Sequence, residues 1–234
     1  MRINNVAGYV LRRQDYGDTS LLVDLFTRDH GRLKVIVKGA RSGRSNKARI
    51  LQPFSELALG WSGKSELKTL TQVEATSASQ LQKEPLICAF YLNELIWNFL
   101  EVQDPHEILY DRYRTILKQF RENDELEPLL RDFELFLLQD VGYGATFDVE
   151  CETGQELTAS GNYRFEIEKG VVPTPEGEEG VSGDLFLALA NRDFSERRVL
   201  GLAKQLTRQI INHRLDGREL YSRKWFADLR RASV

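Results

Sequence analysis

The spacing of apolar residues changes once along the chain, near residue 81, and this change constrains the fold more than any other feature. Before it, short apolar–polar alternations separated by turn-forming residues are typical of β-strands. After it, apolar residues recur at the three-to-four-residue spacing of amphipathic helices. The 234 residues are enough for two domains. We therefore predict a mixed, multi-domain fold, with a strand-rich domain at 1–80 followed by a mainly helical domain at 81–234.

The first 80 residues contain five predicted strands joined mostly by short turns. They lie at Val6–Leu11, Leu21–Leu25, Leu33–Val37, Glu56–Trp61 and Leu67–Glu74. Pro53 precedes the fourth strand, where a missing amide donor is tolerated. Five strands in this length favour a five-stranded β-barrel of the OB-fold type. An SH3-like barrel has a similar strand count, and the alternation alone leaves that alternative open.

The remainder is predicted to be helical, with one irregular insertion. Helical spacing runs through 85–100, 105–120, 128–141, 182–191 and 196–215, and Ser222 is positioned to begin a short last helix. Between the third and fourth of these helices, residues 148–180 are acidic and rich in turns. We expect a solvated excursion there, with a small hairpin near Tyr163–Ile167. Its acidic residues do not follow the ligand spacing of a calcium loop.

Charge is distributed in blocks of opposite sign. Residues 1–80 carry 13 Lys and Arg against 7 Asp and Glu, residues 81–191 carry 8 against 23, and residues 192–234 carry 11 against 5. The first block concentrates its positive charge, because eight basic residues and one acid lie between Arg28 and Arg49. Charge blocks of this kind determine which partners a protein attracts, and they have little influence on its fold.

The basic cluster lies on the third predicted strand and the polar stretch after it. The period of two places Arg32, Lys34 and Lys38 on one face and the aliphatic residues Leu33, Val35 and Val37 on the other. A cationic strand face beside a basic loop suits a phosphate backbone. A solvated face with an ordinary mobile loop is the alternative.

We therefore predict that the barrel domain binds nucleic acid without reading a specific sequence. The predicted DNA-binding residues are Arg32, Lys34, Lys38, Arg41, Arg44, Lys47, Arg49, Lys64 and Lys68. Aromatic residues for base stacking are harder to assign. Of Phe26, Phe54 and Trp61, we expect at least two to belong to the core.

No pattern in the chain indicates catalysis or a cofactor. The phosphate-loop spacing of glycine and lysine is absent, and the three histidines are far apart. Cys88 lies on an apolar helix face, where a core position is expected rather than a nucleophile. We expect no catalytic residue and no cofactor. Because neither a secretory signal nor a membrane-spanning run is visible, we expect a cytoplasmic protein, and the predicted DNA binding would associate it with the nucleoid.

Several strings of the sequence resemble the bacterial RecO family of DNA-repair proteins. They occur in family order over nearly the whole chain, and together they are specific. In the barrel domain they are Thr19–Thr27, Gly31–Lys34, Lys38–Ser42, Leu51–Phe54 and Gly63–Leu70. In the helical domain they are Tyr91–Leu95, Phe133–Leu135, Leu138–Gly144 and Ser222-Arg223.

The resemblance implies an N-terminal OB domain, a helical C-terminal domain and a role as a recombination mediator. It implies binding of single- and double-stranded DNA, annealing of complementary strands, and action with RecR to load RecA onto SSB-coated DNA, with RecF as a possible participant. Many members of the family carry a four-cysteine zinc site after the Gly-Tyr motif. This chain has only Cys151 in that region, so we predict no metal.

The resemblance also implies contact with the acidic C-terminal tail of SSB. Because the central block is acidic, local basic residues must provide the site, and we place it at Arg112, Arg121 and Arg131. The competing function is a non-enzymatic adaptor whose basic barrel binds an acidic protein. A nuclease is a more distant alternative, since the first 80 residues hold only seven acids for a metal site.

Overall fold

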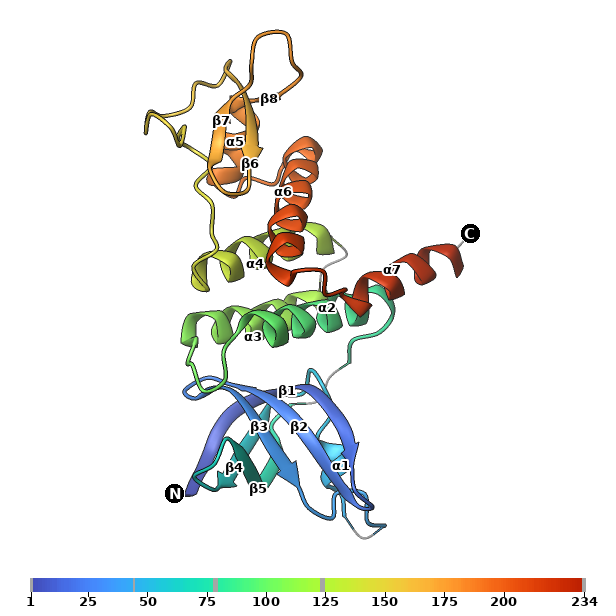
Figure 1. Ribbon diagram of the computed structural model, residues 1–234. Helices are drawn as coiled ribbons and strands as arrows, with labels where there is room; N and C mark the ends of the chain where they lie inside the picture. The colour runs from blue at the N-terminus through green and yellow to red at the C-terminus, as the bar shows by residue number, and fades with distance from the viewer. Residues whose placement is uncertain (1, 44, 78–79, 123–124, 233–234) are drawn as a thin grey trace. The chain divides into compact units, whose positions relative to one another are not determined.

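The computed structural model describes residues 2–43, 45–77, 80–122 and 125–232 (Figure 1). Contacts within the chain divide it into two compact units. The barrel unit comprises Met1–Asp124 with Leu220–Val234, and the second unit comprises Glu125–Glu219. The barrel unit therefore includes residues beyond the domain boundary that we predict at residue 80. That boundary remains a prediction.

The N-terminal strands form a closed five-stranded barrel in the order β1-β2-β3-β5-β4 (Figure 1). The strands are β1 (Arg2–Tyr16), β2 (Ser20–Thr27), β3 (Gly31–Val37), β4 (Leu57–Ser62) and β5 (Leu67–Ala75). β3 and β5 pair in parallel, and the other four pairings are antiparallel. The fold class is as predicted, and the barrel fits the OB-fold.

Alternation along the strands directs aliphatic side chains into the barrel. In β3, Leu33, Val35 and Val37 are buried, whereas Lys34 between them is exposed. Phe26, Phe54 and Trp61 are all buried, in agreement with the expectation that at least two belong to the core. These interior positions leave the cations of β3 on the outer surface.

Two local features near the barrel differ from the prediction. β1 runs from Arg2 to Tyr16, well beyond both ends of the strand predicted at Val6–Leu11. The expected loop after β3 contains a one-turn helix, α1 (Lys47–Ile50). The guanidinium of Arg13 in β1 donates hydrogen bonds to the carbonyls of Ala48 (2.8 Å) and Leu51 (3.2 Å). These bonds hold α1 against β1, although a helix this short has little stability of its own.

Helices α2 (Lys83–Phe99) and α3 (Glu107–Glu122) belong to the barrel unit. β1 has a register shift between Val10 and Arg12, the signature of a β-bulge. The buried amide of Asn93 on α2 donates hydrogen bonds to the carbonyls of Val10 (3.1 Å) and Leu11 (3.0 Å) and accepts one from the Tyr113 hydroxyl. A single side chain therefore joins β1, α2 and α3.

The last helix, α7 (Tyr221–Ala232), also packs in the barrel unit, against α2. The Glu94 carboxylate of α2 accepts hydrogen bonds from the backbone N–H groups of Tyr221 (2.7 Å) and Ser222 (3.0 Å) and from the Ser222 hydroxyl (2.6 Å). A carboxylate at a helix N-terminus satisfies free amides and interacts favourably with the helix dipole. Glu94 thus fixes the start of α7.

The second unit combines three helices with a small sheet. Its elements are α4 (Leu126–Asp140), β6 (Asn162–Glu166), β7 (Gly170–Pro173), β8 (Val181–Ser182), α5 (Gly183–Ala190) and α6 (Arg197–Leu215), with the sheet order β7-β6-β8. The predicted hairpin near Tyr163 is present as β6 and β7. Phe186, Val171 and Ala203 are fully buried in the core that these elements share.

Candidate nucleic-acid interface

Cross-strand pairing builds an exposed strip on the outside of the barrel. Arg12 of β1, Asp24 of β2 and Lys34 of β3 lie opposite one another, and Lys34 is paired with Leu67 of β5. Directly opposed residues share one face of a sheet. We call this surface the open face; its residues are Arg12, Gln14, Tyr16, Leu22, Asp24, Lys34, Ile36, Leu67 and Thr69.

The open face carries apolar side chains as well as cations. The side chains of Tyr16 and Leu67 are 49% and 40% exposed, and Leu22 and Ile36 are half-buried. An exposed aromatic ring beside basic residues can stack a nucleobase while the cations hold phosphates. Sequence reasoning missed Tyr16, although the alternation Arg12, Gln14, Tyr16 places all three on one face.

Next to the open face, part of the outer surface of β1 and β2 is covered by aromatic packing. Tyr9 and Phe26 are opposed in register, and both pack on Tyr110 and Tyr113 of α3, with ring centroids 5.2–6.0 Å apart. Burial raises the pKa of Tyr9, Tyr110 and Tyr113 above the usual tyrosine value. This covered area is not available to a nucleic acid.

Trp97 of α2 lies where the surface covered by aromatic rings meets the open face. The guanidinium carbons of Arg12 and Arg32 lie 4.8 Å and 5.6 Å from its ring centroid. Cation–π contact holds both arginines beside one indole. The Nε of Arg32 is buried without a hydrogen-bond partner among the described residues. Arg12, which sequence reasoning did not single out, is exposed and lies on the open face.

The loop after β3 provides fewer available cations than predicted. Arg41 forms an ion pair with Asp15 at 2.9 Å and also donates to the carbonyls of Gly17 and Ser20. Its guanidinium is therefore engaged with the β1–β2 turn. Lys38 directly follows β3 and is exposed, as is Arg49 on α1, whereas Lys47 is half-buried. Arg44 lies outside the described residues.

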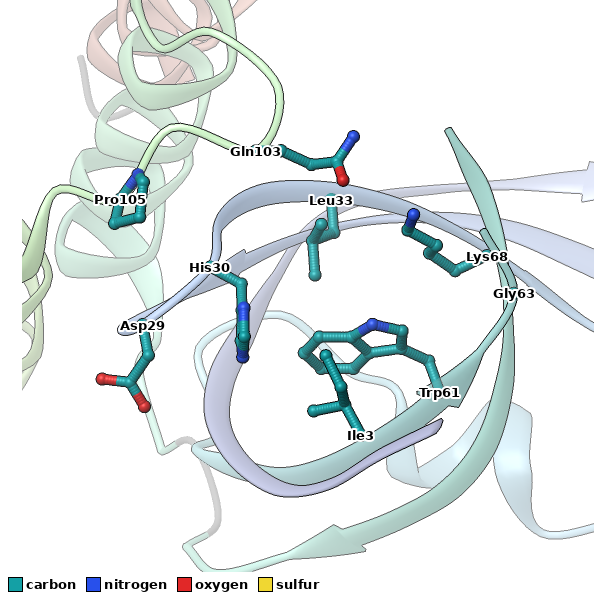
Figure 2. A pocket seen from close by; sticks show the side chains of 9 residues that line it. All are labelled: Ile3, Asp29, His30, Leu33, Trp61, Gly63, Lys68, Gln103 and Pro105. Carbon is teal, nitrogen blue, oxygen red and sulfur yellow. The ribbon is translucent and has the colours of Figure 1, made fainter. Parts of the chain in front are cut away.

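The two lysines near β5 differ in accessibility. Lys64 is exposed in the connection between β4 and β5. Lys68 is only 8% exposed and lines a pocket at the end of the barrel, shown in Figure 2. It therefore cannot contact a nucleic acid on the open face in the way that Lys34 can.

The three predicted partner-binding arginines do not belong to one compact unit. Arg112 and Arg121 are exposed on α3 of the barrel unit. Arg131 lies on α4 of the second unit, where it is buried and forms an ion pair with buried Glu134 at 3.0 Å. The same carboxylate accepts a hydrogen bond from the Thr207 hydroxyl. Arg131 thus serves an internal polar cluster.

Within the described ranges, no group of three or more His, Cys, Asp or Glu side chains is arranged to hold a metal ion. Cys88 is buried in the barrel unit, and Cys151 is exposed in the second unit. The absence of zinc remains a prediction. None of the helices in the described part of the chain combines the length and apolar character needed to cross a membrane.

Comparison with known proteins agrees with this architecture. The family model described as "Recombination protein O N terminal" matches residues 1–78, and "Recombination protein O C terminal" matches residues 83–224. The chain belongs to the RecO family. RecO proteins of this kind include the DNA repair protein RecO of Methylococcus capsulatus, which is 44% identical over 93% of this chain and 90% of its own length.

Other RecO relatives align over similarly long stretches. The DNA repair protein RecO of Thiobacillus denitrificans is 40% identical over 97% of this chain and 93% of its own length. That of Polynucleobacter necessarius is 38% identical over 99% of this chain and 98% of its own length. The gap between the two RecO family matches, at residues 79–82, lies beside the domain boundary that the change in periodicity predicts.

Proposed function

We propose that this RecO-family DNA repair protein binds single- and double-stranded DNA on the open face and anneals complementary strands. The observation that carries the proposal is the combination of exposed Arg12 and Lys34 with exposed Tyr16 on one strip of an OB-type barrel. Lys38, Arg49 and Lys64 extend the positive charge over the neighbouring connections and α1. Basic grooves with aromatic platforms are the usual means of binding single strands without sequence preference.

The proposed annealing mechanism requires no covalent chemistry, and the function is non-enzymatic. The cations neutralise phosphates on two strands, which lowers the repulsion between them and raises their local concentration. Tyr16 and the flanking aliphatic residues contact bases without selecting among them. The strands are then free to pair by their own hydrogen bonds and stacking.

The test is fluorescence anisotropy of a labelled single-stranded oligonucleotide with matched charge reversals. Lys34→Glu with Lys38→Glu should weaken binding by at least tenfold, because two exposed phosphate contacts become repulsive. Arg197→Glu with Arg208→Glu introduces the same charge change on α6 of the second unit and should weaken binding much less. Equal losses in the two variants would place the DNA site outside the open face.

Base contact is tested separately with Tyr16→Ala and Tyr16→Ser. Removal of a stacked ring costs about 1–3 kcal/mol per base, so affinity should fall by roughly fivefold or more while the salt dependence stays the same. An unchanged affinity in both variants would exclude Tyr16 as a stacking platform.

We further propose that the protein acts with RecR to load RecA onto SSB-coated DNA, with RecF as a possible participant, in the cytoplasm and at the nucleoid. Membership of the RecO family supports this proposal. For the SSB tail, the exposed Arg112 and Arg121 on α3 remain candidates. Arg131 is a poor candidate as placed, because its guanidinium is buried beside Glu134.

The adaptor alternative, in which the barrel binds an acidic protein surface, makes a different prediction in a competition experiment. Both functions are electrostatic, so salt dependence alone does not separate them. A plain oligonucleotide should displace an acidic partner only if the two share the open face. Failure of the native protein to bind any oligonucleotide would favour the adaptor.

A further inference from the structure

A small pocket opens at one end of the barrel, and none of the open-face residues lines it. Its volume is about 190 Å³. Figure 2 shows the side chains that surround it; the lining residues are Ile3, Asp29, His30, Leu33, Trp61, Gly63, Lys68, Gln103 and Pro105. All of them belong to the barrel unit. Pockets that bury whole small molecules span about 300–1,000 Å³, so this one fits a single small group.

The pocket contains a buried cation. Lys68 is paired in register with Val35, whose side chain points into the barrel, so Lys68 occupies an interior position whereas its neighbour Leu67 faces outward. Among the described residues, its Nζ makes one polar contact, at 3.5 Å from the carbonyl oxygen of Lys64. Burial of an ammonium group is costly without a charged partner. This arrangement favours an anion as the ligand of the pocket.

The other walls provide apolar surface and further donors. The rings of His30 and Trp61 meet edge to face with centroids 5.2 Å apart, and Leu33 is buried beside them. Gln103 is placed by its backbone N–H, which donates to the Arg32 carbonyl at 2.8 Å. Figure 2 shows Asp29 on the opposite side of the pocket from Lys68, and its carboxylate forms an ion pair with Arg28 at 3.3 Å.

Glycine at position 31 allows the segment with Gln103 to close this side of the pocket. Gly31 has φ +62°, and a Cβ there would lie 1.9 Å from the Asp104 carbonyl oxygen. Any other residue would therefore push residues 102–105 away from the β2–β3 turn. The close approach of Gly31 and Asp104 holds residues 102–105 in place as one wall of the pocket.

We propose that this pocket binds a terminal phosphate of a DNA strand, an inference that rests on the proposed function. A phosphomonoester matches one ammonium group, an amide and an imidazole within a small volume. An internal phosphate carries a sugar on each side and does not fit as easily. Lys34 of the open face is paired with Leu67, the residue before Lys68, so a strand that crosses β3 and β5 reaches the rim of the pocket.

The experiment compares oligonucleotides of one sequence that carry 5′-phosphate, 3′-phosphate or only hydroxyl ends. Affinity is measured on the native protein, and fluorescence is measured on a Trp97→Phe, Trp225→Phe variant, in which Trp61 is the single tryptophan of the three in the chain. A terminal phosphate should increase affinity at least fivefold and change Trp61 fluorescence. Lys68→Met, which keeps the aliphatic stem, should abolish the difference, and Lys118→Met at an exposed position of α3 should preserve it.

Equal affinity for phosphorylated and hydroxyl ends would overturn the assignment and leave the proposed function intact. If no oligonucleotide binds, the proposed function fails. Titration with inorganic phosphate then tests separately whether the pocket binds an anion. A Trp61 response that saturates with phosphate and is absent with acetate supports it. A response to acetate of equal strength would identify a carboxylate site instead, and no response to either anion would overturn the pocket proposal.

A second variant tests the pocket independently if Lys68→Met does not fold. Gln103 is exposed and lies in a connection between helices, so Gln103→Ala should fold normally. The variant should reduce the preference for a phosphorylated end by roughly threefold without changing affinity for hydroxyl ends. A preference that is unaffected by Gln103→Ala and by a folded Lys68→Met would overturn the proposal.

Discussion

Asn93 illustrates how one buried polar side chain fixes the junction of three elements. Its amide N–H groups donate to the carbonyls of Val10 and Leu11 at the bulge in β1, and its oxygen accepts a hydrogen bond from the Tyr113 hydroxyl. Buried polar groups that lose their partners cost about 1–3 kcal/mol each. The bulge also determines that Arg12 faces outward on the open face, so the stability and the candidate site depend on the same residue.

Asn93→Leu should lower the free energy of unfolding by about 3 kcal/mol, because it leaves buried carbonyls and a hydroxyl unpaired. Urea denaturation followed by circular dichroism measures the change. Asn98→Leu on the same helix removes a hydrogen bond to the Glu94 carbonyl in a half-buried position and should cost under about 1 kcal/mol. Similar losses for the two variants would contradict this role of Asn93.

Arg131 and Glu134 form the most buried ion pair among the described residues, with side chains 8% and 1% exposed. Breaking such a pair costs about 3–5 kcal/mol, since it leaves one charge uncompensated. We expect a loss of this size for Arg131→Met in thermal or urea unfolding. Arg121→Met on the exposed part of α3 should change stability by less than about 0.5 kcal/mol. A mild effect at Arg131 would show that its guanidinium is solvated.

At the scale of elements, α3 packs on the barrel through the rings of Tyr110 and Tyr113, whereas α2 uses Phe90, Asn93 and Trp97. Tyr113 has a hydrogen-bond partner in Asn93, whereas the buried hydroxyl of Tyr110 has none among the described residues. The same packing covers Tyr9 and Phe26 on the outer strand surface and leaves the open face uncovered. Helix packing thereby limits the surface that the proposed DNA contact can use.

The tyrosine cluster predicts a loss of stability in alkali. Burial raises the pKa of Tyr9, Tyr110 and Tyr113 above the unfolded value of about 10. The neutral phenols are favoured in the folded state, so their stabilising effect is complete below pH 10 and is lost as pH rises above it. Urea unfolding at a series of pH values from 8 to 12 measures the slope.

Two phenylalanine variants test the origin of this pH dependence. Tyr110→Phe removes a hydroxyl without a partner and should leave stability at pH 7 unchanged or higher, while flattening the alkaline slope. Tyr113→Phe should also flatten the slope, but it should destabilise the protein at pH 7 by about 1 kcal/mol because Asn93 loses a donor. Slopes identical to that of the native protein in both variants would exclude the cluster as their cause.

At the scale of the whole molecule, the excess of positive charge at residues 1–80 is partly neutralised within the barrel unit itself. Residues 1–80 hold 13 basic and 7 acidic residues, but several of the cations are engaged within the protein. Arg41 pairs with Asp15, Arg28 pairs with Glu107 and Asp111, and Lys68 is buried. The number of phosphates that the barrel can neutralise is therefore well below its count of basic residues.

We expect the salt dependence of single-strand binding to reflect this smaller number. Neutralisation of about four to six phosphates gives a log–log slope of about −3 to −4 between affinity and salt concentration. Anisotropy titrations from 50 to 300 mM salt provide the value. A slope near −1 would mean that most of these cations do not contact phosphates, and one steeper than −6 would require a second basic surface.

Local sequence determined the elements of this protein, because strand and helix periodicity depends on residues close together in the chain. It correctly predicted the existence of the five barrel strands, every helix of the described residues except α1, and the outward direction of Lys34. Tertiary structure decided which of those side chains remain accessible. Lys68 is buried by the parallel pairing of β3 with β5, Arg131 is paired with Glu134, and Tyr16 is left exposed. Such outcomes depend on contacts between distant segments, which no local pattern of polarity encodes.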